Sequence, residues 1–443
     1  MAYDNPARGM LAWQDLSSDR RIAAGTADKL FVTSASGTTT DISPSDLVSG
    51  DVLAAVNTGY GGSFYGTGSY GVPRPDTGNF AEATTWSLDN WGEYLVACST
   101  SDGRLLEWQL NTASDAAVIA NAPVDNLGLV VTAERFLFAL GAGGNPRKVQ
   151  WSDFEDNTLW APASTNQAGD IELQTPGQIQ CGVQVRGQTL ILTDRDAHSA
   201  TYQGPPFVYQ FERVGQACGT PSRRAVAVVD AGAFWMGQEG FFAYAGGAVS
   251  DVKCDVSDYI FDDINRAQIS TVHAVANAQY GEIWWFYPSS ASTECDRYAM
   301  FNYKEGHWSI GQLTRSSGVP RGVFSYPILA DSAGNLYDHE VGLNYDGSTV
   351  FAETAPISLG AGDQVMSVTH LYPDEKTQGD VTATFKTRFY PNATERSYGP
   401  YAMSAPTSVR FTGRQVRMRV AGARATDWRV GTMRLDAKPR GIR

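Results

Sequence analysis

Hydrophobic residues along this chain fall in short runs that glycine- and turn-rich stretches separate, a pattern typical of many short strands. Three such runs follow one another closely at Gly281–Tyr287, Tyr298–Tyr303 and His307–Leu313, and most of their large side chains are aromatic. Pro288 ends the first run, because proline lacks the N–H group that a sheet ladder needs. Cross-strand pairs of aromatic rings stabilise small antiparallel sheets. The pattern therefore predicts a meander with both faces covered, which is the form of one β-propeller blade.

Groups of strands like this one recur along the chain, each built around turn residues such as Asp102 and Gly103. Asp-Gly favours a tight hairpin, because a type I′ turn needs positive φ at both central residues. The groups are Trp86–Leu110, Leu127–Trp151, Ile179–Tyr202, Ala225–Val249, Val272–Leu313 and Gly322–Val341. Their spacing of about 40–50 residues is typical of propeller blades. We therefore predict an all-β fold with an irregular β-propeller of about six blades.

The segment Asp255–Ile269 has a helical pattern instead. Val256, Tyr259 and Ile260 share one face at helical spacing, and Asp255 is placed to cap the first turn. The four aspartates of this segment lack the alternating spacing of a calcium-binding loop. Capping and solvation explain them better than a metal site does, so one short inserted helix is predicted.

The end of the chain has strands in which apolar and polar residues alternate with a period of two. The alternating segments are Val365–Leu371, Val381–Tyr390, Thr407–Thr412, Gln415–Ala421 and Arg429–Asp436. They predict a small β-sandwich or barrel, a platform added to the propeller. A hairpin around Gly25–Asp28, near the start of the chain, is expected to contribute to this platform.

These patterns divide the chain into four parts. Residues 1–56 are an N-terminal segment whose hairpin joins the platform, 57–79 a Gly/Tyr-rich loop, 80–350 the propeller-like body, and 351–443 the basic platform. The loop has no hydrophobic period, so we interpret it as an irregular connection or an interface arm.

Charge is divided unevenly along the chain, which has 34 basic and 47 acidic residues and a net charge of −13. Residues 376–443 contain 14 basic and four acidic residues, which leaves residues 1–375 at −23. This asymmetry indicates a basic appendage suited to an acidic surface. The alternative is a strand domain whose solvent face simply uses arginine. No recognition helix or aromatic-lined groove indicates that the region binds nucleic acid.

The sequence motifs of common enzymes, phosphate loops and metal sites do not occur in the chain. Asp153, Glu155 and Asp156 could supply the paired carboxylates of a glycoside hydrolase, although a turn whose acids bind backbone amides is the simpler interpretation. The five cysteines are widely spaced and odd in number, which favours buried thiols in a reducing compartment. There is no apolar run of about 18 residues and no secretory signal. We predict no catalytic residue, no cofactor and no metal.

Three segments resemble the tail nozzle proteins of short-tailed bacteriophages, a family also called tail tubular protein B or packaged-DNA stabilisation-type proteins. They are VQWSDFEDNTLWAPASTNQAGDIEL (149–173), AFWMGQEGFFAYAGG…DYIFDDINRAQ (233–268) and EIWWFYPS…DRYAMFNYKEGHWSIG (282–311). Residues 83–108 and 428–441 are also similar to this family. These motifs are strand-and-turn signatures, so they indicate the family rather than the role of single residues. The chain is shorter than some members, which puts an elaborate fibre-docking or tip domain in doubt.

The resemblance implies a virion structural protein without enzymatic activity, made in the host cytoplasm and built into the phage tail. Six copies would form a ring below the portal and the tail adaptor protein, and a tail fibre or tip protein could attach there. The ring channel would retain the packaged genomic DNA and conduct it during ejection, without sequence-specific binding.

Charge agrees with such a role. A body at −23 repels phosphates within about 8–10 Å, while the basic platform could bind an acidic adaptor or a neighbouring subunit. As hypothetical interface residues we single out Arg414, Arg417, Arg419, Arg424, Arg429, Tyr60, Tyr65 and Tyr70.

Two alternatives stay open. A glycan-binding or glycan-cleaving β-propeller would stack tyrosines and tryptophans on sugars and use Asp153 and Asp156 for chemistry. A generic interaction propeller fits the composition but explains neither the uneven charge nor the resemblance.

Overall fold

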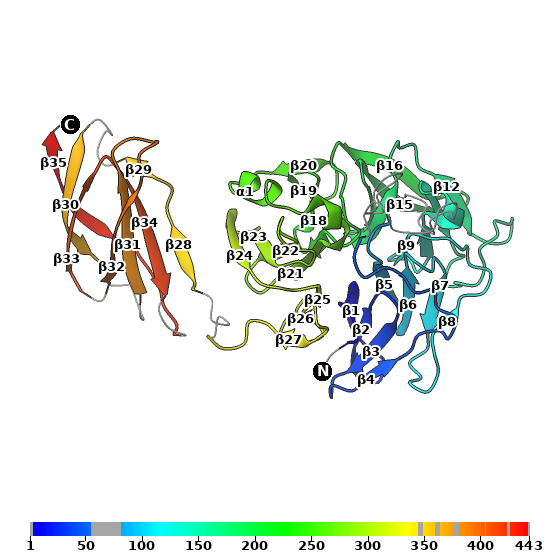
Figure 1. Cartoon of the computed structure of the whole chain (residues 1–443). Coiled ribbons are helices and arrows are strands. Elements are labelled where there is room, and N and C mark those ends of the chain that lie inside the picture. Colours follow the sequence, from blue (N-terminus) through cyan, green and yellow to red (C-terminus); the bar gives the residue numbers. More distant parts are fainter. Residues whose placement is uncertain are drawn as a thin grey trace, which may run out of the picture. The chain divides into compact units, whose positions relative to one another are not determined.

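The computed structural model describes residues 3–54, 81–343, 349–358, 364–374, 381–403, 405–422 and 426–441. The chain divides into two compact units, Met1–His339 and Glu340–Arg443. Nearly all of the regular elements described in both units are strands (Figure 1). The expected Gly/Tyr-rich loop of 57–79 lies outside the described residues.

Seven antiparallel sheets make up the described part of the first unit, and each is a meander of strands that are consecutive in the chain (Figure 1). The first four sheets are β1 (Gly9–Gln14), β2 (Arg20–Gly25), β3 (Leu30–Ser34) and β4 (Thr39–Asp41); β5 (Trp86–Trp91), β6 (Tyr94–Ser99), β7 (Leu105–Trp108) and β8 (Ala117–Val118); β9 (Gly128–Val131), β10 (Leu137–Leu140), β11 (Lys148–Trp151) and β12 (Gly169–Glu172); and β13 (Ile179–Val185), β14 (Gln188–Thr193), β15 (Asp196–Gly204) and β16 (Val208–Gln216). The other three are β17 (Val226–Val229), β18 (Gly232–Met236), β19 (Phe241–Tyr244) and β20 (Val249–Val252); β21 (His273–Asn277), β22 (Glu282–Tyr287), β23 (Arg297–Asn302) and β24 (His307–Gln312); and β25 (Ser317–Val319), β26 (Ile328–Ala330) and β27 (Leu336–Asp338).

The first strand of each sheet contacts the first strand of the next, in the order β1, β5, β9, β13, β17, β21 and β25. Strand β25 contacts β1 again, so the sheets close into a ring. In Figure 1, β25–β27 accordingly lie beside β1 and β2. The first unit is therefore a seven-bladed β-propeller, which confirms the predicted fold class and adds one blade to the expected number.

The additional blade is the N-terminal segment, which we had expected to join the platform. Strands β1–β4 pair with one another and belong to the first compact unit, so this expectation was wrong. The expected boundary near residue 350 also differs from the one observed, because the first unit ends at His339. A hairpin has the same local sequence pattern in a propeller blade and in the platform. Only contacts between residues distant in sequence decide which of the two it joins.

Residues before β1 hold the two ends of the ring together. The Tyr3 N–H donates to the Gly334 carbonyl at 2.9 Å, and the Tyr3 ring stacks on Phe31 at 5.4 Å between centroids. Arg8 is fully buried and forms a bidentate ion pair with Glu294, with N–O distances of 2.5 and 3.0 Å. These contacts join the start of the chain to the last two blades.

The aromatic meander predicted at 280–313 is the sixth blade, and its strands agree with the prediction to within a residue or two. Phe301 pairs with Trp308 across the β23–β24 ladder, with ring centroids 4.8 Å apart. Phe241 of the fifth blade packs between Trp285 and Trp308, at 4.9 and 4.5 Å. Aromatic side chains therefore form the core between neighbouring blades, where large buried rings stabilise the fold most.

The predicted helix is shorter than expected. Helix α1 spans only Ser257–Phe261, and a separate 3-10 segment spans Arg266–Thr271. Asn265 lies between them in an extended conformation, its N–H donates to the Pro288 carbonyl, and its side chain caps the second segment. Asp255 makes no capping hydrogen bond, because the residue at the helix start is Val256. Pairing with the sixth blade thus overrides the local helical pattern.

The second unit is a β-sandwich, as predicted. Its strands are β28 (Phe351–Glu353), β29 (Ile357–Ser358), β30 (Val365–Tyr372), β31 (Val381–Arg388), β32 (Arg396–Ala402), β33 (Thr407–Gly413), β34 (Gln415–Gly422) and β35 (Arg434–Gly441). One sheet has the order β28-β34-β31-β32, with β29 also paired to β34, and the other has the order β33-β30-β35. Phe385 and Phe411 stack between the sheets at 4.8 Å.

Candidate functional site

The arginines of β34 point away from the sandwich core. Val416 and Val420 are buried, whereas Arg417 and Arg419 are partly exposed on the outer face of the sheet. This alternation follows from the period of two in a strand. The exposure of these two arginines is compatible both with the predicted interface and with the alternative of a strand domain whose solvent face uses arginine.

Both arginines are already engaged by an acid of the same unit. Glu353 of β28 lies 3.2 Å from Arg417, 3.9 Å from Arg419 and 3.0 Å from Lys386, measured between nitrogen and carboxylate oxygen. Arg417 also approaches Glu395 at 3.5 Å, and the Arg419 guanidinium lies 3.7 Å from the Phe351 ring centroid. The Glu353 side chain is only 12% exposed, so this cluster, which we call the Glu353 cluster, supports the sheet itself.

The other predicted interface residues are more scattered. Arg414 lies between β33 and β34 with its guanidinium 5.6 Å from the Tyr390 ring centroid, and Arg429 is exposed. The remaining four lie outside the described residues: Arg424, Tyr60, Tyr65 and Tyr70. The structure therefore gathers Arg417 and Arg419 and leaves Arg414 and Arg429 apart from them.

A second group of basic side chains lies on the opposite sheet, β33-β30-β35, and sequence reasoning did not single it out. The group, which we call the basic outer face, consists of Arg410, Arg434, Lys438 and Arg440. All four are exposed, whereas Val409 and Phe411 on either side of Arg410 are buried. The period-two alternation in TSVRFTG would have identified Arg410 as outward-facing. The rest could not be found this way, because β35 begins five residues later than predicted.

One acid lies close to this basic outer face. Asp436 accepts a hydrogen bond from the Thr369 hydroxyl at 2.8 Å and lies 3.7 Å from His370. The pKa of Asp436 is lowered, first by the Thr369 hydrogen bond and then by Lys438 and His370. The face therefore keeps a net positive charge, suited to an acidic protein surface.

The acids proposed for glycoside chemistry form a turn. The Asp153 carboxylate accepts N–H groups of Phe154 and Gln167 at 2.8 and 2.7 Å. Asp156 accepts the N–H and hydroxyl of Thr158 at 2.8 and 2.6 Å, and Glu155 is exposed. These bonds match the simpler interpretation, in which the acids satisfy backbone donors between two tryptophans.

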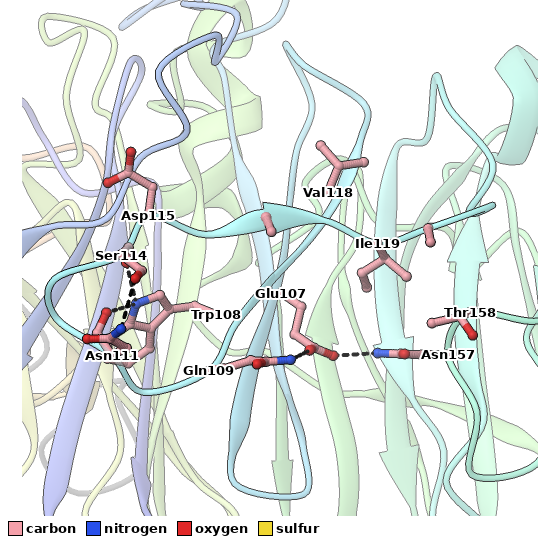
Figure 2. Close-up of a pocket in the computed structure, with 12 residues that line it drawn as sticks. Glu107, Trp108, Gln109, Asn111, Ser114, Asp115, Val118, Ile119, Asn157 and Thr158 are labelled. Atoms are coloured by element: carbon pink, nitrogen blue, oxygen red, sulfur yellow. Dashed lines mark hydrogen bonds between the residues drawn. The ribbon is translucent and has the colours of Figure 1, made fainter.

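A polar cleft of about 410 Å³ lies between the second and third blades (Figure 2). Glu107 of β7 accepts the side-chain amides of Gln109 and Asn157, at 2.7 and 2.6 Å. The Trp108 ring is 1% exposed and its N–H donates to the Asn111 carbonyl. The cleft thus offers amides and carboxylates to a ligand but no aromatic face for stacking.

A second hollow of about 330 Å³ lies on the propeller axis, lined by residues from all seven inner strands or from the turns just before them. Asp89 of β5 is half-buried on its wall and accepts the Val131 N–H at 2.8 Å. Arg223, just before β17, is 8% exposed and bonds to Glu82 at 2.7 Å. Charged side chains are therefore placed inside the ring.

The cysteines are thiols, and four of the five are buried. Burial raises the pKa of Cys98, Cys181 and Cys295 to about 12, which keeps these thiols protonated and unreactive at neutral pH. Among the described residues, no cluster of His, Cys, Asp or Glu could hold a metal ion. The described part of the chain also contains no helix with the length and apolar character to cross a membrane.

No protein-family model and no curated protein matches the sequence. Three similar solved structures are virginiamycin B lyase from Staphylococcus aureus (9% identity, TM-score 0.46, 76% of this chain and 96% of that one), the N-terminal domain of Nup159 (11%, 0.39, 75% and 89%) and an exo-β-1,3-galactanase from Phanerochaete chrysosporium (10%, 0.32, 99% and 98%). Similarity this distant carries no argument about the activity of this chain. None of the three is a phage tail protein.

Proposed function

We propose that this chain is a virion structural protein that forms the tail nozzle of a short-tailed phage. The sequence resemblance in residues 149–173, 233–268 and 282–311 carries the proposal. These segments cover parts of the third, fifth and sixth blades, where they supply blade strands and the turns between them. A nozzle subunit needs shape and rigid interfaces rather than chemistry, so strand-and-turn motifs are the ones its function would preserve.

The charge of the two units agrees with this proposal. Residues 1–339 contain 20 basic and 37 acidic residues, a net charge of −17, whereas residues 340–443 contain 14 and ten, a net charge of +4. A channel wall of like charge repels DNA phosphates within about 8–10 Å, so the genome could pass without being held. The basic outer face would bind an acidic surface of the adaptor or of the next copy in a hexameric ring.

The proposal is tested on virus particles with an antibody to this chain. We expect the chain to co-sediment with intact particles and the antibody to label the distal end of the tail by electron microscopy. Absence of the chain from particles would refute the proposal.

A charge-reversal pair tests whether the basic outer face makes the contact. Arg410→Glu, Arg434→Glu and Lys438→Glu together should lower the amount of chain in particles about tenfold, which a loss of about 1.4 kcal/mol in binding would cause. The control reverses the exposed propeller residues Arg20, Arg213 and Lys253, with the same change in net charge. Equal incorporation of the two triple variants would exclude this face as the contact.

The polar cleft of Figure 2 favours one alternative, a glycan-binding β-propeller. Its amides and Glu107 resemble the polar groups that orient hydroxyl-rich ligands in pockets. A glycan screen would support this alternative if binding were lost in Glu107→Ala and kept in Asp153→Asn, because Asp153 serves a turn and does not line the cleft.

A further inference from the structure

The central cavity of the propeller has a basic end. Arg223, Arg224, His273 and Ser317 lie at or just before the starts of the inner strands β17, β21 and β25, and all four line the cavity. Asp89 lies three residues into β5 from Trp86, or about 10 Å along that strand. The basic residues are thus gathered at the end where the inner strands begin.

Arg224 donates hydrogen bonds only to neutral acceptors in the described part of the chain. Its guanidinium lies 3.0 Å from the Ser317 hydroxyl, 3.3 Å from the Thr271 carbonyl and 3.4 Å from the Ser316 carbonyl. Burial and nearby Arg8 lower the pKa of Arg224 to about 9, so the group is still charged at neutral pH. Within the described ranges, no carboxylate comes within ion-pair distance of it.

Neighbouring arginines have acidic partners already. Arg8 is paired with Glu294, and Arg223 is paired with Glu82. Arg224 is therefore the third guanidinium at an end of the cavity whose two carboxylates are already paired, and Asp89, which also lines the cavity, lies about 10 Å along β5 from its start. Arg224 is half-buried, and an unbalanced charge that is partly removed from water is costly, so a bound anion would stabilise this region.

Buried polar atoms at the same end also have no hydrogen-bond partner in the part of the chain that the structure describes. They are Nε of Arg223, Nε of Arg224 and Nε2 of His273. His273 is only 2% exposed, and its ring stacks on Phe286 with centroids 5.1 Å apart. Leaving a buried polar atom without a hydrogen-bond partner is costly, and a ligand carrying both oxyanion and hydroxyl oxygens could satisfy these atoms.

We propose that the basic end of the central cavity binds a small oxyanion of the phosphate or carboxylate class, held chiefly by Arg224. A guanidinium offers its N–H donors in a fork that matches two oxygens of such an anion. The volume of about 330 Å³ suits a small molecule. The proposal does not depend on the tail nozzle function.

The first experiment measures binding to the full chain by calorimetry at pH 7.5, with inorganic phosphate, sulfate and citrate as separate probes. Sodium chloride at equal ionic strength is the reference. We expect saturable binding of at least one probe and a rise in the melting temperature that chloride does not reproduce. Binding of phosphate alone would assign the site to the phosphate class, and binding of citrate alone to the carboxylate class. Binding of all three would show that the site accepts both classes. Absence of saturable binding for every probe would overturn the proposal.

A matched pair of variants at Ser317 identifies the site. Ser317→Asp places a carboxylate beside Arg224, because the Ser317 hydroxyl lies 3.0 Å from the guanidinium. It should weaken binding about tenfold or more and raise the melting temperature without added anion. Ser317→Asn introduces a side chain of nearly the same volume as Ser317→Asp but without the charge, so it should weaken binding much less than Ser317→Asp does. Equal affinities of the two variants would place any bound anion elsewhere.

Arg224→Gln is a second, independent test, because loss of the guanidinium should abolish anion binding. This variant also removes bonds that connect three blades, so it is compared only if its circular dichroism matches that of the natural chain. If it does not fold, the Ser317 pair alone decides.

Discussion

Glu353 determines how the outer arginines of the sandwich can be used. Its carboxylate forms ion pairs with Lys386, Arg417 and Arg419. Without this carboxylate, the three positive charges would repel one another. Reversing Arg417 and Arg419 would place two more acids beside a carboxylate that is 12% exposed. Loss of assembly in such a variant would therefore report damage to the sheet rather than a lost contact, and for this reason the basic outer face is the better target.

Glu353→Gln should destabilise the sandwich by about 1–3 kcal/mol, because it leaves basic groups without their shared acceptor. Hydrogen exchange followed by mass spectrometry on the full chain would measure this, through faster exchange in β28, β31 and β34. Glu395→Gln is the control, since Glu395 contacts only Arg417 among these residues and is more exposed. Equal protection in the two variants would contradict the role given to Glu353.

Asp89 should make stability depend on pH. Burial raises the pKa of Asp89 to about 6, although N–H groups of Val131 and Asn90 oppose the shift. The folded chain thus binds this proton more tightly than the unfolded chain. The resulting stabilisation is complete below the ordinary aspartate pKa near 4 and is lost as pH rises through 6.

Urea unfolding at pH 4, 5, 6 and 7 tests this expectation. The stability of the natural chain relative to Asp89→Asn should fall between pH 4 and 6 and then stay constant. Arg223, Arg224 and His273 line the same cavity and are present in both proteins. Asp255→Asn, at an aspartate whose side chain is 73% exposed, is the control. A constant difference across this range would show that Asp89 is not perturbed.

At the scale of elements, the contact between the first two blades depends on a missing side chain. A Cβ atom at Gly25 of β2 would lie 2.2 Å from the Trp86 ring, whose N–H donates to the Thr26 carbonyl at 2.6 Å. Trp86 is 3% exposed and has no room to move. The glycine at this position therefore permits the close packing of β2 against β5.

Gly25→Ala should destabilise the propeller by about 1–3 kcal/mol, the usual effect of overpacking a core. Tryptophan fluorescence during urea unfolding would measure it, since ten of the eleven tryptophans belong to the first unit. Gly247→Ala is the matched control, because nothing lies within 4 Å of a Cβ atom there. An equal loss in both variants would mean that replacing a glycine as such, not the Trp86 contact, sets the effect.

The elements themselves were predictable where a local pattern decides them. β22, β23 and β24 follow from aromatic runs, Pro288 and a glycine turn, which act within a few residues. The helix was predicted too long because the break at Asn265 comes from a bond to Pro288, a partner in another element. β32 was missed because Gly399 and Pro400 interrupt its alternation.

Of the candidate site, the alternation in the sequence identified the strand that carries Arg417 and Arg419 but not the partners of these arginines. Glu353 precedes Arg417 by more than sixty positions, and only the pairing of β28 with β34 brings them together. The basic end of the cavity was likewise hidden, because Arg224, His273 and Ser317 are isolated in the sequence and meet only when the ring closes.

At the scale of the whole molecule, the Arg8–Glu294 ion pair connects the start of the chain to the sixth blade, although the two residues are 286 positions apart in the sequence. Arg8→Gln should destabilise the propeller by about 3–5 kcal/mol, because it removes the guanidinium that donates to both the Glu294 carboxylate and the Val52 carbonyl. Urea unfolding followed by tryptophan fluorescence would show it. The double variant Arg8→Gln, Glu294→Gln should be less destabilised than the sum of the single ones. Additive losses would show that the pair is not coupled.

The order of blades along the chain also bears on how the protein is made. Each blade consists of consecutive strands, so blades can form one after another while the ribosome is still synthesising the rest. The contacts of Tyr3 with Gly334 and of β1 with β25 must wait until the seventh blade has been translated. Until then β1 has no neighbour on one side. A prematurely terminated chain would keep that side uncovered, which makes truncated products of this protein prone to associate with one another.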